Sequence, residues 1–401
     1  MSIMKKYGLL TVLALLALGV ACAGGSGVAD DPASESAAAA PADAGGVQAP
    51  MFEVDPFWPK PLPNHWLLGS TIGVDADPQD HIWIVHRGAS TLGAAETPAL
   101  NDPPTAEGCC APAPPILEFD PAGNLVGSWG GPGDGYDWPL SNHGITIDHM
   151  DNVWIGGNGA GDSHALKFTR GGDFLLQVGV AGRDPDSLSL DSFGRIAKIS
   201  FDGPANEIYL ADGYGNKRVA VVDADTGEVK RFWGAYGNEP DDSYSERYTP
   251  GAPPPPQFAS PVHCAEVSDS GLIYVCDRAQ DRIQVFQKDG TFVDEMFVLP
   301  NTTGSGSAWD IAFSPDQTFI YLVDGVNQRV HIIHRENLEH LTSFGDGGRQ
   351  AGQFYGAHSI TVDSQGNIYT TETFEGKRLQ KFVYKGMGPV TSLNQGTPWP
   401  R

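Results

Sequence analysis

The chain has 401 residues and a formal net charge of -24, because 49 acidic residues outnumber 25 lysines and arginines. Nucleic-acid binding needs a basic surface that neutralises phosphates, so this charge balance excludes nucleic acid as a partner. An acidic, well-solvated surface is its simple consequence.

The first 23 residues are typical of an export signal. Two lysines precede an apolar run from Tyr7 to Val20, which has the length of a signal-peptide core and is too short for a comfortable membrane span. Cys22 follows Leu18-Gly19-Val20-Ala21, which resembles a bacterial lipoprotein box with its aliphatic residue one place early. Lipidation at Cys22 and cleavage after Ala23 are both open. We therefore predict an extracytoplasmic protein, either a periplasmic or outer-membrane lipoprotein with a lipid anchor, or a secreted protein.

Residues 24–50 are small and polar, so they bury too little apolar surface to offset the entropy of ordering. We predict a disordered tether there. Residues 51–390 are predicted to form one folded domain, because their repeats run without a break. Residues 391–401 are assigned to a C-terminal tail.

Six short segments share a turn, an apolar-aromatic-apolar strand and a second alternating strand, which is typical of half-buried β-structure. The segments are His81-Ile82-Trp83-Ile84, Asn152-Val153-Trp154-Ile155, Glu207-Ile208-Tyr209-Leu210, Leu272-Ile273-Tyr274-Val275, Phe319-Ile320-Tyr321-Leu322 and Asn367-Ile368-Tyr369-Thr370. Their aromatic residues are 71, 55, 65, 47 and 48 residues apart, and the shortest spacings are those of propeller blades. A sandwich is the alternative, but it has no reason to repeat one unit six times. The sequence therefore predicts an all-β, six-bladed β-propeller.

The longer spacings contain two insertions, residues 89–115 and residues 238–256. Loops on one rim of a scaffold commonly cover a binding face. Decoration of the surface is the alternative for both insertions.

Three histidines precede the apolar pair of their segment by ten residues: His143, His263 and His358. They fall on blades 2, 4 and 6. The equivalent positions on blades 1, 3 and 5 are Ile72, Lys198 and Asp310. Equivalent positions in a ring face its axis, so alternate blades would bring three imidazoles together. We predict a three-histidine metal site with an open fourth position, which suits catalytic zinc. The alternative is that each histidine merely fills the inner end of its strand.

Arg87 and Arg278 stand five residues after the first apolar residue of their segments, Ile82 and Ile273, and Tyr214 stands six residues after Ile208 on blade 3. All three are expected near one rim of the ring. An arginine is a permanent cation suited to a carboxylate, and a tyrosine beside a metal and an arginine can act as a base. The alternative is structural, with Asp277-Arg278 and Asp212 tying the blades together.

Cys264 and Cys276 flank a turn and could face each other across a hairpin, as a disulfide or as two buried thiols. The adjacent Cys109 and Cys110 lie in the first insertion, and the sequence assigns them no partner.

Several motifs resemble, in order, those of the peptidylglycine-amidating lyase (peptidyl-α-hydroxyglycine α-amidating lyase) family. They are His86-Arg87-Gly88, Leu140-Ser141-Asn142-His143-Gly144-Ile145, Ala211-Asp212-Gly213-Tyr214-Gly215-Asn216-Lys217-Arg218-Val219, Ser260-Pro261-Val262-His263, Cys276-Asp277-Arg278 with Arg282-Ile283-Gln284, and Gly356-Ala357-His358. The resemblance implies a six-bladed propeller of the NHL-repeat type and spans residues 52–382.

The resemblance also implies cleavage of a carbinolamide C-N bond to give an amide and glyoxylate. Zinc would be bound by His143, His263 and His358, and Tyr214 would remove the hydroxyl proton. Arg87, with Arg278 in support, would hold the substrate, which is expected to be a small molecule or peptide with a carboxylate.

The chain departs from the family at three places. Gly356 replaces a methionine, Gly215 replaces a disulfide cysteine, and Ser359 replaces an aspartate that helps to hold a structural calcium. Calcium is thus a second candidate metal that Ser359 disfavours. Two other functions are open: a non-catalytic NHL-repeat propeller that acts as a tethered binding platform, and a propeller hydrolase of the lactonase kind, whose calcium site would have only Asp310 as an acid at this register.

Overall fold

The computed structural model describes residues 46–245 and 248–400. The predicted export signal, Cys22 and nearly all of the predicted tether lie outside the described residues. Among those described, no helix has both the length and the apolar character needed to cross a bilayer.

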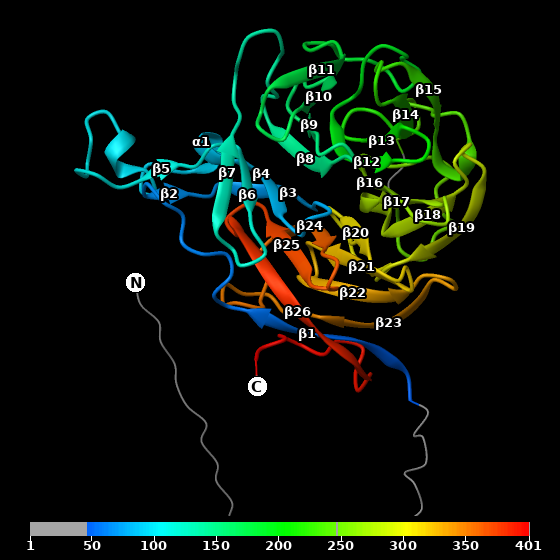
Figure 1. Ribbon diagram of the computed structural model, residues 1–401. Coiled ribbons are helices and arrows are strands. Elements are labelled where there is room, and N and C mark those ends of the chain that lie inside the picture. Colours follow the sequence, from blue (N-terminus) through cyan, green and yellow to red (C-terminus); the bar gives the residue numbers. More distant parts are fainter. Residues whose placement is uncertain (1–45, 246–247, 401) are drawn as a thin grey trace, which may run out of the picture. The chain divides into compact units, whose positions relative to one another are not determined.

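Six four-stranded antiparallel sheets surround a common centre like the blades of a propeller (Figure 1). The prediction of an all-β, six-bladed propeller is therefore confirmed. Blades 1 to 3 consist of β3 (Ser70–Ala76), β4 (Ile82–Arg87), β6 (Ile116–Phe119) and β7 (Leu125–Trp129); β8 (Asn142–Ile147), β9 (Val153–Gly157), β10 (His164–Phe168) and β11 (Phe174–Gly179); and β12 (Ile196–Asp202), β13 (Glu207–Asp212), β14 (Arg218–Asp223) and β15 (Val229–Trp233).

Blades 4 and 5 repeat this order. They consist of β16 (Val262–Val267), β17 (Ile273–Asp277), β18 (Arg282–Phe286) and β19 (Phe292–Phe297), followed by β20 (Asp310–Phe313), β21 (Phe319–Asp324), β22 (Arg329–His334) and β23 (Glu339–Phe344).

Blade 6 joins the two ends of the described chain. Its first three strands are β24 (Ala357–Val362), β25 (Ile368–Glu372) and β26 (Arg378–Pro389), and its fourth is β1 (Gln48–Asp55), which pairs with β26. Strand β1 thus begins inside the segment predicted as tether. The residues after 390 form backbone hydrogen bonds with strands of the propeller. Ser343 N donates to Leu393 O, and Val54 N donates to Pro398 O. The C-terminal segment therefore packs on the propeller.

The repeated aromatic residue has a structural cause. In blade 2, Asp148 accepts hydrogen bonds from two backbone N-H groups of its turn, and Trp154 Nε1 donates to the same carboxylate at 3.0 Å. Blades 1 and 6 use the same arrangement, with Trp83 on Asp77 and Tyr369 on Asp363. Each aromatic ring is buried. The ring fills the core of the blade while its polar edge closes the turn.

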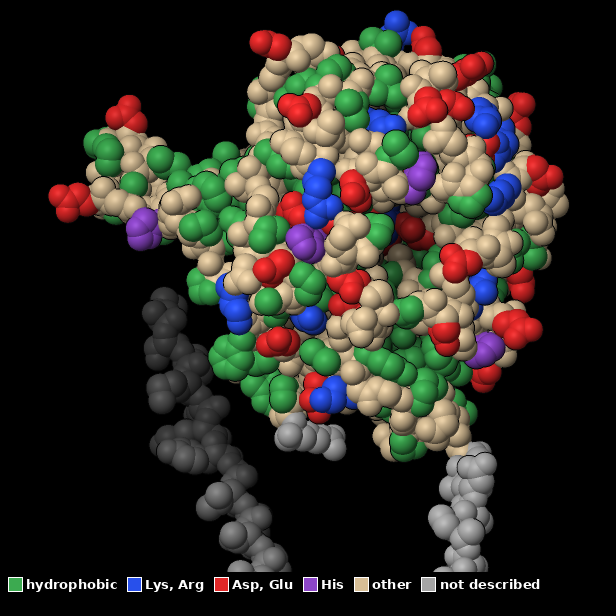
Figure 2. Space-filling view, in the orientation of Figure 1, with side chains coloured by type: hydrophobic (Ala, Val, Ile, Leu, Met, Phe, Trp, Pro, Cys, Tyr) green, Lys and Arg blue, Asp and Glu red, His purple; other side chains and the backbone are tan. Residues whose placement is uncertain are grey.

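The remaining elements lie in the connections. They are β2 (Trp66–Leu67), which pairs in parallel with β5 (Ala111–Pro112), the short helix α1 (Gly88–Thr91), and the 3-10 turns η1 (Pro98–Leu100), η2 (Ala235–Gly237) and η3 (Arg278–Gln280). The insertion at residues 89–115 extends away from the ring (Figure 1). Figure 2 shows acidic side chains spread over the visible face, with lysines and arginines among them.

The four cysteines of the described part form two disulfides. Cys264 and Cys276 are directly opposed on β16 and β17, with their Cα atoms 4.8 Å apart. Of the two alternatives for this pair, the structure contains the disulfide. Cys109 and Cys110, to which the sequence assigned no partner, are joined to each other in the first insertion.

Candidate metal centre

The three predicted histidines occupy the same place in the fold. His143, His263 and His358 are each the second residue of an inner strand, β8, β16 and β24 respectively. The pairing of the inner strand with its neighbour shifts at this register in five of the six blades. Such bulges change the direction of a side chain, and here they occur where the three histidine side chains point toward the centre of the propeller.

The rings meet at the centre. Their centroids are 5.2 Å apart for His143 and His263, 4.8 Å for His143 and His358, and 4.9 Å for His263 and His358. One ring nitrogen from each lies within 4.8 Å of the other two. Only 1 to 3% of each residue is exposed. The structure therefore brings together the three histidines that the sequence had grouped.

Two of the rings are held by the backbone of the next blade. His143 Nδ1 donates to Ala197 O of blade 3, and His263 Nδ1 donates to Trp309 O, just before β20 of blade 5. A carbonyl oxygen only accepts, so Nδ1 of each ring must carry the proton. Nε2 is then left with its lone pair.

The third ring uses a hydroxyl in between. Ser359 Oγ donates to Ile72 O of blade 1 at 2.9 Å and accepts from His358 Nδ1 at 3.1 Å. His358 is thus also held by the next blade, but through the hydroxyl of Ser359 rather than directly by a backbone carbonyl. Nε2 of His358 also carries its lone pair.

All three imidazoles are neutral at ordinary pH. Burial is the main cause and lowers the pKa of each ring well below 6.5, and the positive charge of Arg278 lowers all three further. Neutral imidazoles with a fixed Nδ1-H and a free Nε2 are the form that ligates metal ions. Three such ligands and an open fourth position suit zinc, so the donor set fits the metal expected from the sequence.

Tyr214 lies directly against two of the histidines. Its hydroxyl is 3.0 Å from His143 Nε2 and 3.1 Å from His263 Nε2. Gly213 makes this approach possible, because a Cβ at that position would lie 2.1 Å from Val262 O, next to His263. The phenol is half-buried and faces the three-histidine centre.

The structural ion pairs use arginines other than Arg278, whose Nε donates to Ser305 O at 3.1 Å. Asp277 binds Arg282 at 2.9 Å, and Asp212 binds Arg218 at 2.8 Å. Arg278 Nη1 instead donates to Tyr214 Oη at 3.3 Å. The alternative in which Asp277 pairs with Arg278 is therefore wrong.

The indole ring of Trp309 lies against the guanidinium group of Arg278. The guanidinium carbon lies 4.5 Å from the indole centroid, a cation-π distance. Trp309 also supplies the carbonyl that orients His263. The sequence reasoning missed this residue, although it directly precedes Asp310, which stands at the histidine register.

Arg87 approaches the centre from blade 1. Its Nε donates to Asn142 O at 3.0 Å and its Nη2 donates to Asn158 Oδ1 at 2.8 Å, which fixes the plane of the guanidinium. Among the described residues no partner is found for Nη1. The charge of Arg87 contributes to the lowered pKa of His143 and His358, so Arg87 is electrostatically coupled to the centre.

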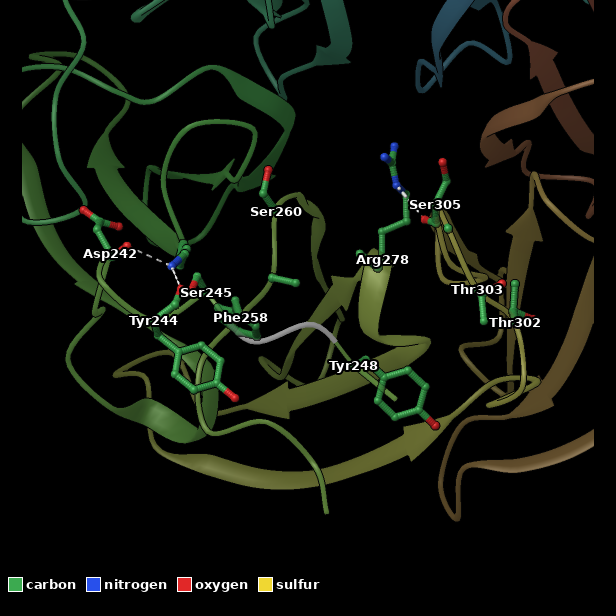
Figure 3. Close-up of a pocket in the computed structure, with 14 residues that line it drawn as sticks. Asp242, Tyr244, Ser245, Tyr248, Phe258, Ser260, Arg278, Thr302, Thr303 and Ser305 are labelled. Atoms are coloured by element: carbon green, nitrogen blue, oxygen red, sulfur yellow. Dashed lines mark hydrogen bonds between the residues drawn. The ribbon is translucent and has the colours of Figure 1, made fainter. Parts of the chain in front are cut away.

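A cavity of about 450 Å³ lies beside Arg278 (Figure 3). The second insertion supplies Tyr244 and Tyr248 to its wall, and Ser260 lines it near the site. Figure 3 shows the guanidinium of Arg278 at the end of the cavity away from both tyrosine rings. The insertion at residues 238–256 thus forms part of a cavity next to the candidate centre.

The calcium expected from the family resemblance does not fit these residues. At the position of the family's aspartate, the neutral Ser359 hydroxyl is used by His358 and Ile72. Asp310, the acid that a lactonase-like site would need, binds Lys198 Nζ at 2.6 Å. A hard divalent cation would have to displace that ammonium group.

Fold and site together define a six-bladed β-propeller with a histidine cluster at its centre. A family model described as "Lactonase, 7-bladed beta-propeller" matches residues 191–370, less than half of the chain. The structure has six four-stranded sheets rather than seven.

Two curated relatives are similar over most of this chain. Peptidyl-alpha-hydroxyglycine alpha-amidating lyase 1 of Drosophila melanogaster is 25% identical over 359 residues, which are 84% of this chain and 60% of the relative. NHL repeat-containing protein 3 of Mus musculus is 23% identical over 363 residues, 84% of this chain and 85% of the relative. The chain therefore spans about 60% of the length of the lyase that it resembles.

Among solved structures, a protein of unknown function from Bacteroides thetaiotaomicron matches with a TM-score of 0.50 and 12% identity. The match covers 84% of this chain and 77% of the other. This likeness concerns the fold alone.

Proposed function

We propose that the protein is a zinc-dependent lyase that cleaves a carbinolamide C-N bond, as the resemblance to the amidating lyase suggests. The observation that supports this most is the group of three neutral imidazoles with Tyr214 and Arg278 against them. His143, His263 and His358 would hold the zinc ion. Bound zinc would act as a Lewis acid on an oxygen of the substrate.

The substrate is an amide whose nitrogen bears a hydroxylated carbon with a carboxylate. In the reaction the hydroxyl oxygen becomes the aldehyde oxygen of glyoxylate, the C-N bond breaks, and the nitrogen gains a proton. Tyr214 accepts the hydroxyl proton and returns it to the amide nitrogen as the C-N bond breaks, so that no other proton source is needed. A guanidinium that donates to the phenol oxygen stabilises negative charge there, which is the role of Arg278.

Arg87 binds the carboxylate of the substrate. Two of its donors are fixed by Asn142 and Asn158, so the guanidinium is oriented before the substrate arrives, and such preorganisation favours catalysis. The amide-bearing part of the substrate lies in the cavity beside Arg278, which has room for a peptide or a bulky acyl group.

The test combines metal analysis with a glyoxylate-release assay on an α-hydroxyglycine peptide. The parent is expected to contain about one zinc per chain, and His143→Ala, His263→Ala and His358→Ala are each expected to lose it. Absence of stoichiometric metal from the unsubstituted protein would contradict the proposal.

Tyr214→Phe separates chemistry from metal binding. We expect it to keep its zinc and to lose activity by a factor of about 100 or more, the usual contribution of a general base. Tyr384→Phe, at an exposed tyrosine on β26 outside this cavity, is the matched control and should retain full activity.

The second candidate function is a tethered, non-catalytic binding platform, which the similarity to an NHL repeat-containing protein favours. It predicts that no glyoxylate is released and that Tyr214→Phe changes nothing.

A further inference from the structure

Two of the three blades without a metal-binding histidine carry opposite charges at the same register. Lys198 on β12 of blade 3 places its ammonium 2.6 Å from Asp310 Oδ1 on β20 of blade 5. The same ammonium lies 2.9 Å from Glu266 Oε1 on β16 of blade 4. One cation therefore joins three consecutive blades.

This ion pair sits directly beside the groups that orient two histidines. Ala197, whose carbonyl holds His143, precedes Lys198, and Trp309, whose carbonyl holds His263, precedes Asp310. Because adjacent backbone groups move together, fixing the side chains of Lys198 and Asp310 restrains both carbonyls.

Asp310 extends the connection to the third histidine. Its Oδ2 accepts a hydrogen bond from Ile360 N at 3.1 Å, on the strand that carries His358. Its Oδ1 also accepts from Ile311 N at 2.9 Å. The Asp310 carboxylate thus contacts the strand of His358 directly and reaches the strand of His263 through Lys198 and Glu266.

The cluster is largely shielded from solvent, where such contacts are strong. The Lys198 side chain is 12% exposed and that of Asp310 is 1% exposed. Burial alone would lower the pKa of Lys198, but the attraction of Asp310 and Glu266 outweighs it and raises that pKa. Burial raises the pKa of Glu266 to about 7. The lysine therefore stays charged while one of its carboxyl partners readily takes up a proton.

We propose that Lys198 is a positioning residue whose ammonium, held by Asp310 and Glu266, ties blades 3, 4 and 5 together and so fixes the carbonyls that orient His143 and His263 for metal binding. The inference rests on the proposed metal centre.

The test compares Lys198→Met with Lys167→Met in full-length protein. Lys167 on β10 is a matched control, because its side chain is also 12% exposed and faces a buried carboxylate, Asp148, at 3.7 Å. Zinc affinity is measured by competition with a chelator. We expect Lys198→Met to weaken zinc binding about 10-fold or more, as for other residues that orient ligands, and Lys167→Met to leave it unchanged. Equal zinc affinity in Lys198→Met and the parent overturns the proposal.

A second pair of variants covers the case in which Lys198→Met does not fold. Asp310→Asn keeps the size of the side chain and an acceptor for Ile360 N. The double variant Lys198→Met/Asp310→Asn removes both charges, so no unpaired buried carboxylate remains at Asp310. We expect the double variant to recover thermal stability but not zinc affinity. Recovery of both would show that the ion pair only stabilises the fold.

A readout without metal separates this inference from the proposed function. In metal-free protein, the hydrogen-bonded Nδ1 protons of His143 and His263 should give protected ring N-H signals in proton NMR. We expect Lys198→Met to lose these signals and Lys167→Met to keep them. If the parent binds no zinc, the proposed function fails. The NMR signals test the positioning role separately, because their retention in Lys198→Met would refute that role.

Discussion

His358 differs from the other two histidines in the group that holds its ring. A backbone carbonyl holds His143 and His263, whereas a serine hydroxyl stands between His358 and Ile72. A hydroxyl can rotate and change partners, so it restrains the ring less than a carbonyl that belongs to a strand. His358 is therefore the ligand whose orientation is most open to change by substitution.

We expect Ser359→Ala to weaken metal binding by about 10-fold, since it removes the hydroxyl that links His358 Nδ1 to blade 1. Ser359→Thr retains the hydroxyl and should restore most of the affinity. Chelator competition with both variants tests this. Equal affinities for the alanine and threonine variants would contradict it.

Asp281 gives a pH-dependent prediction that does not involve the centre. It is fully buried, Ser307 N donates to it at 2.8 Å, and burial raises its pKa to about 7. A carboxyl whose pKa rises on folding favours the folded state while it is protonated, so this contribution is present below about pH 4 and is lost as the pH rises to 7.

Asp281→Asn cannot ionise and keeps an acceptor for Ser307. We therefore expect its melting temperature, relative to the parent, to rise between pH 4 and pH 8, by the equivalent of up to about 4 kcal/mol. Thermal unfolding over this range measures it, with the exposed Asp184→Asn as control. A constant difference at all pH values would argue against this role of Asp281.

At the scale of elements, the turn after β13 decides where Tyr214 lies. The backbone at Gly213 passes so close to Val262, at the start of β16, that a Cβ would meet Val262 N at 2.2 Å. Any side chain there must push the turn away from blade 4. Tyr214 would move with it.

Gly213→Ala should therefore lower kcat by 10-fold or more and cost about 2 kcal/mol of stability, typical of overpacking. Zinc content should change little, because the three histidines lie on other strands. Gly108→Ala, where no atom lies within 4 Å of the added Cβ, is the control. Full activity in Gly213→Ala would mean that the turn has room to adjust.

The sequence predicted the inner strands and their histidines well because one local pattern repeats. An aromatic residue stands near the start of each second strand, and in blades 1, 2 and 6 it closes the preceding turn, as Trp154 does on Asp148. The inner strand then lies at a constant offset before it, and the histidines share that offset. Contacts between blades have no such signal, so Trp309 and the bond from Ser359 to Ile72 could not be predicted.

The role of the insertions also could not be predicted from composition. Both are rich in proline, yet residues 89–115 extend away from the ring while residues 238–256 line the cavity beside Arg278. Their placement depends on the packing of long loops against neighbouring blades. A sequence pattern of turns and strands does not contain that information.

At the scale of the whole molecule, the ring is closed by its own ends. Strand β1 contributes the buried Phe52 and Val54 to blade 6, and pairs with β26 along its length. The sequence predicts residues 48–50 as tether because residues 24–50 contain almost no large apolar side chain that could be buried. Their pairing partner lies more than 300 residues away, beyond the reach of any local pattern.

Removal of residues 46–55 should abolish cooperative unfolding or cause aggregation, because it strips blade 6 of a strand and leaves the edge of β26 open. Removal of residues 24–45, the rest of the predicted tether, should leave the melting temperature unchanged. Thermal unfolding of the two truncated proteins, followed by circular dichroism, compares them. A stable protein without residues 46–55 would show that closure is dispensable.

The closure of blade 6 has a consequence for the order in which the proposed centre is completed. His143 and His263 lie on blades built from contiguous sequence, whereas His358 lies on the blade that needs both β26 and β1. A growing or nicked chain can thus present two ligands but not a firmly held third. Metal uptake by the proposed centre would then follow the pairing of β1 with β26.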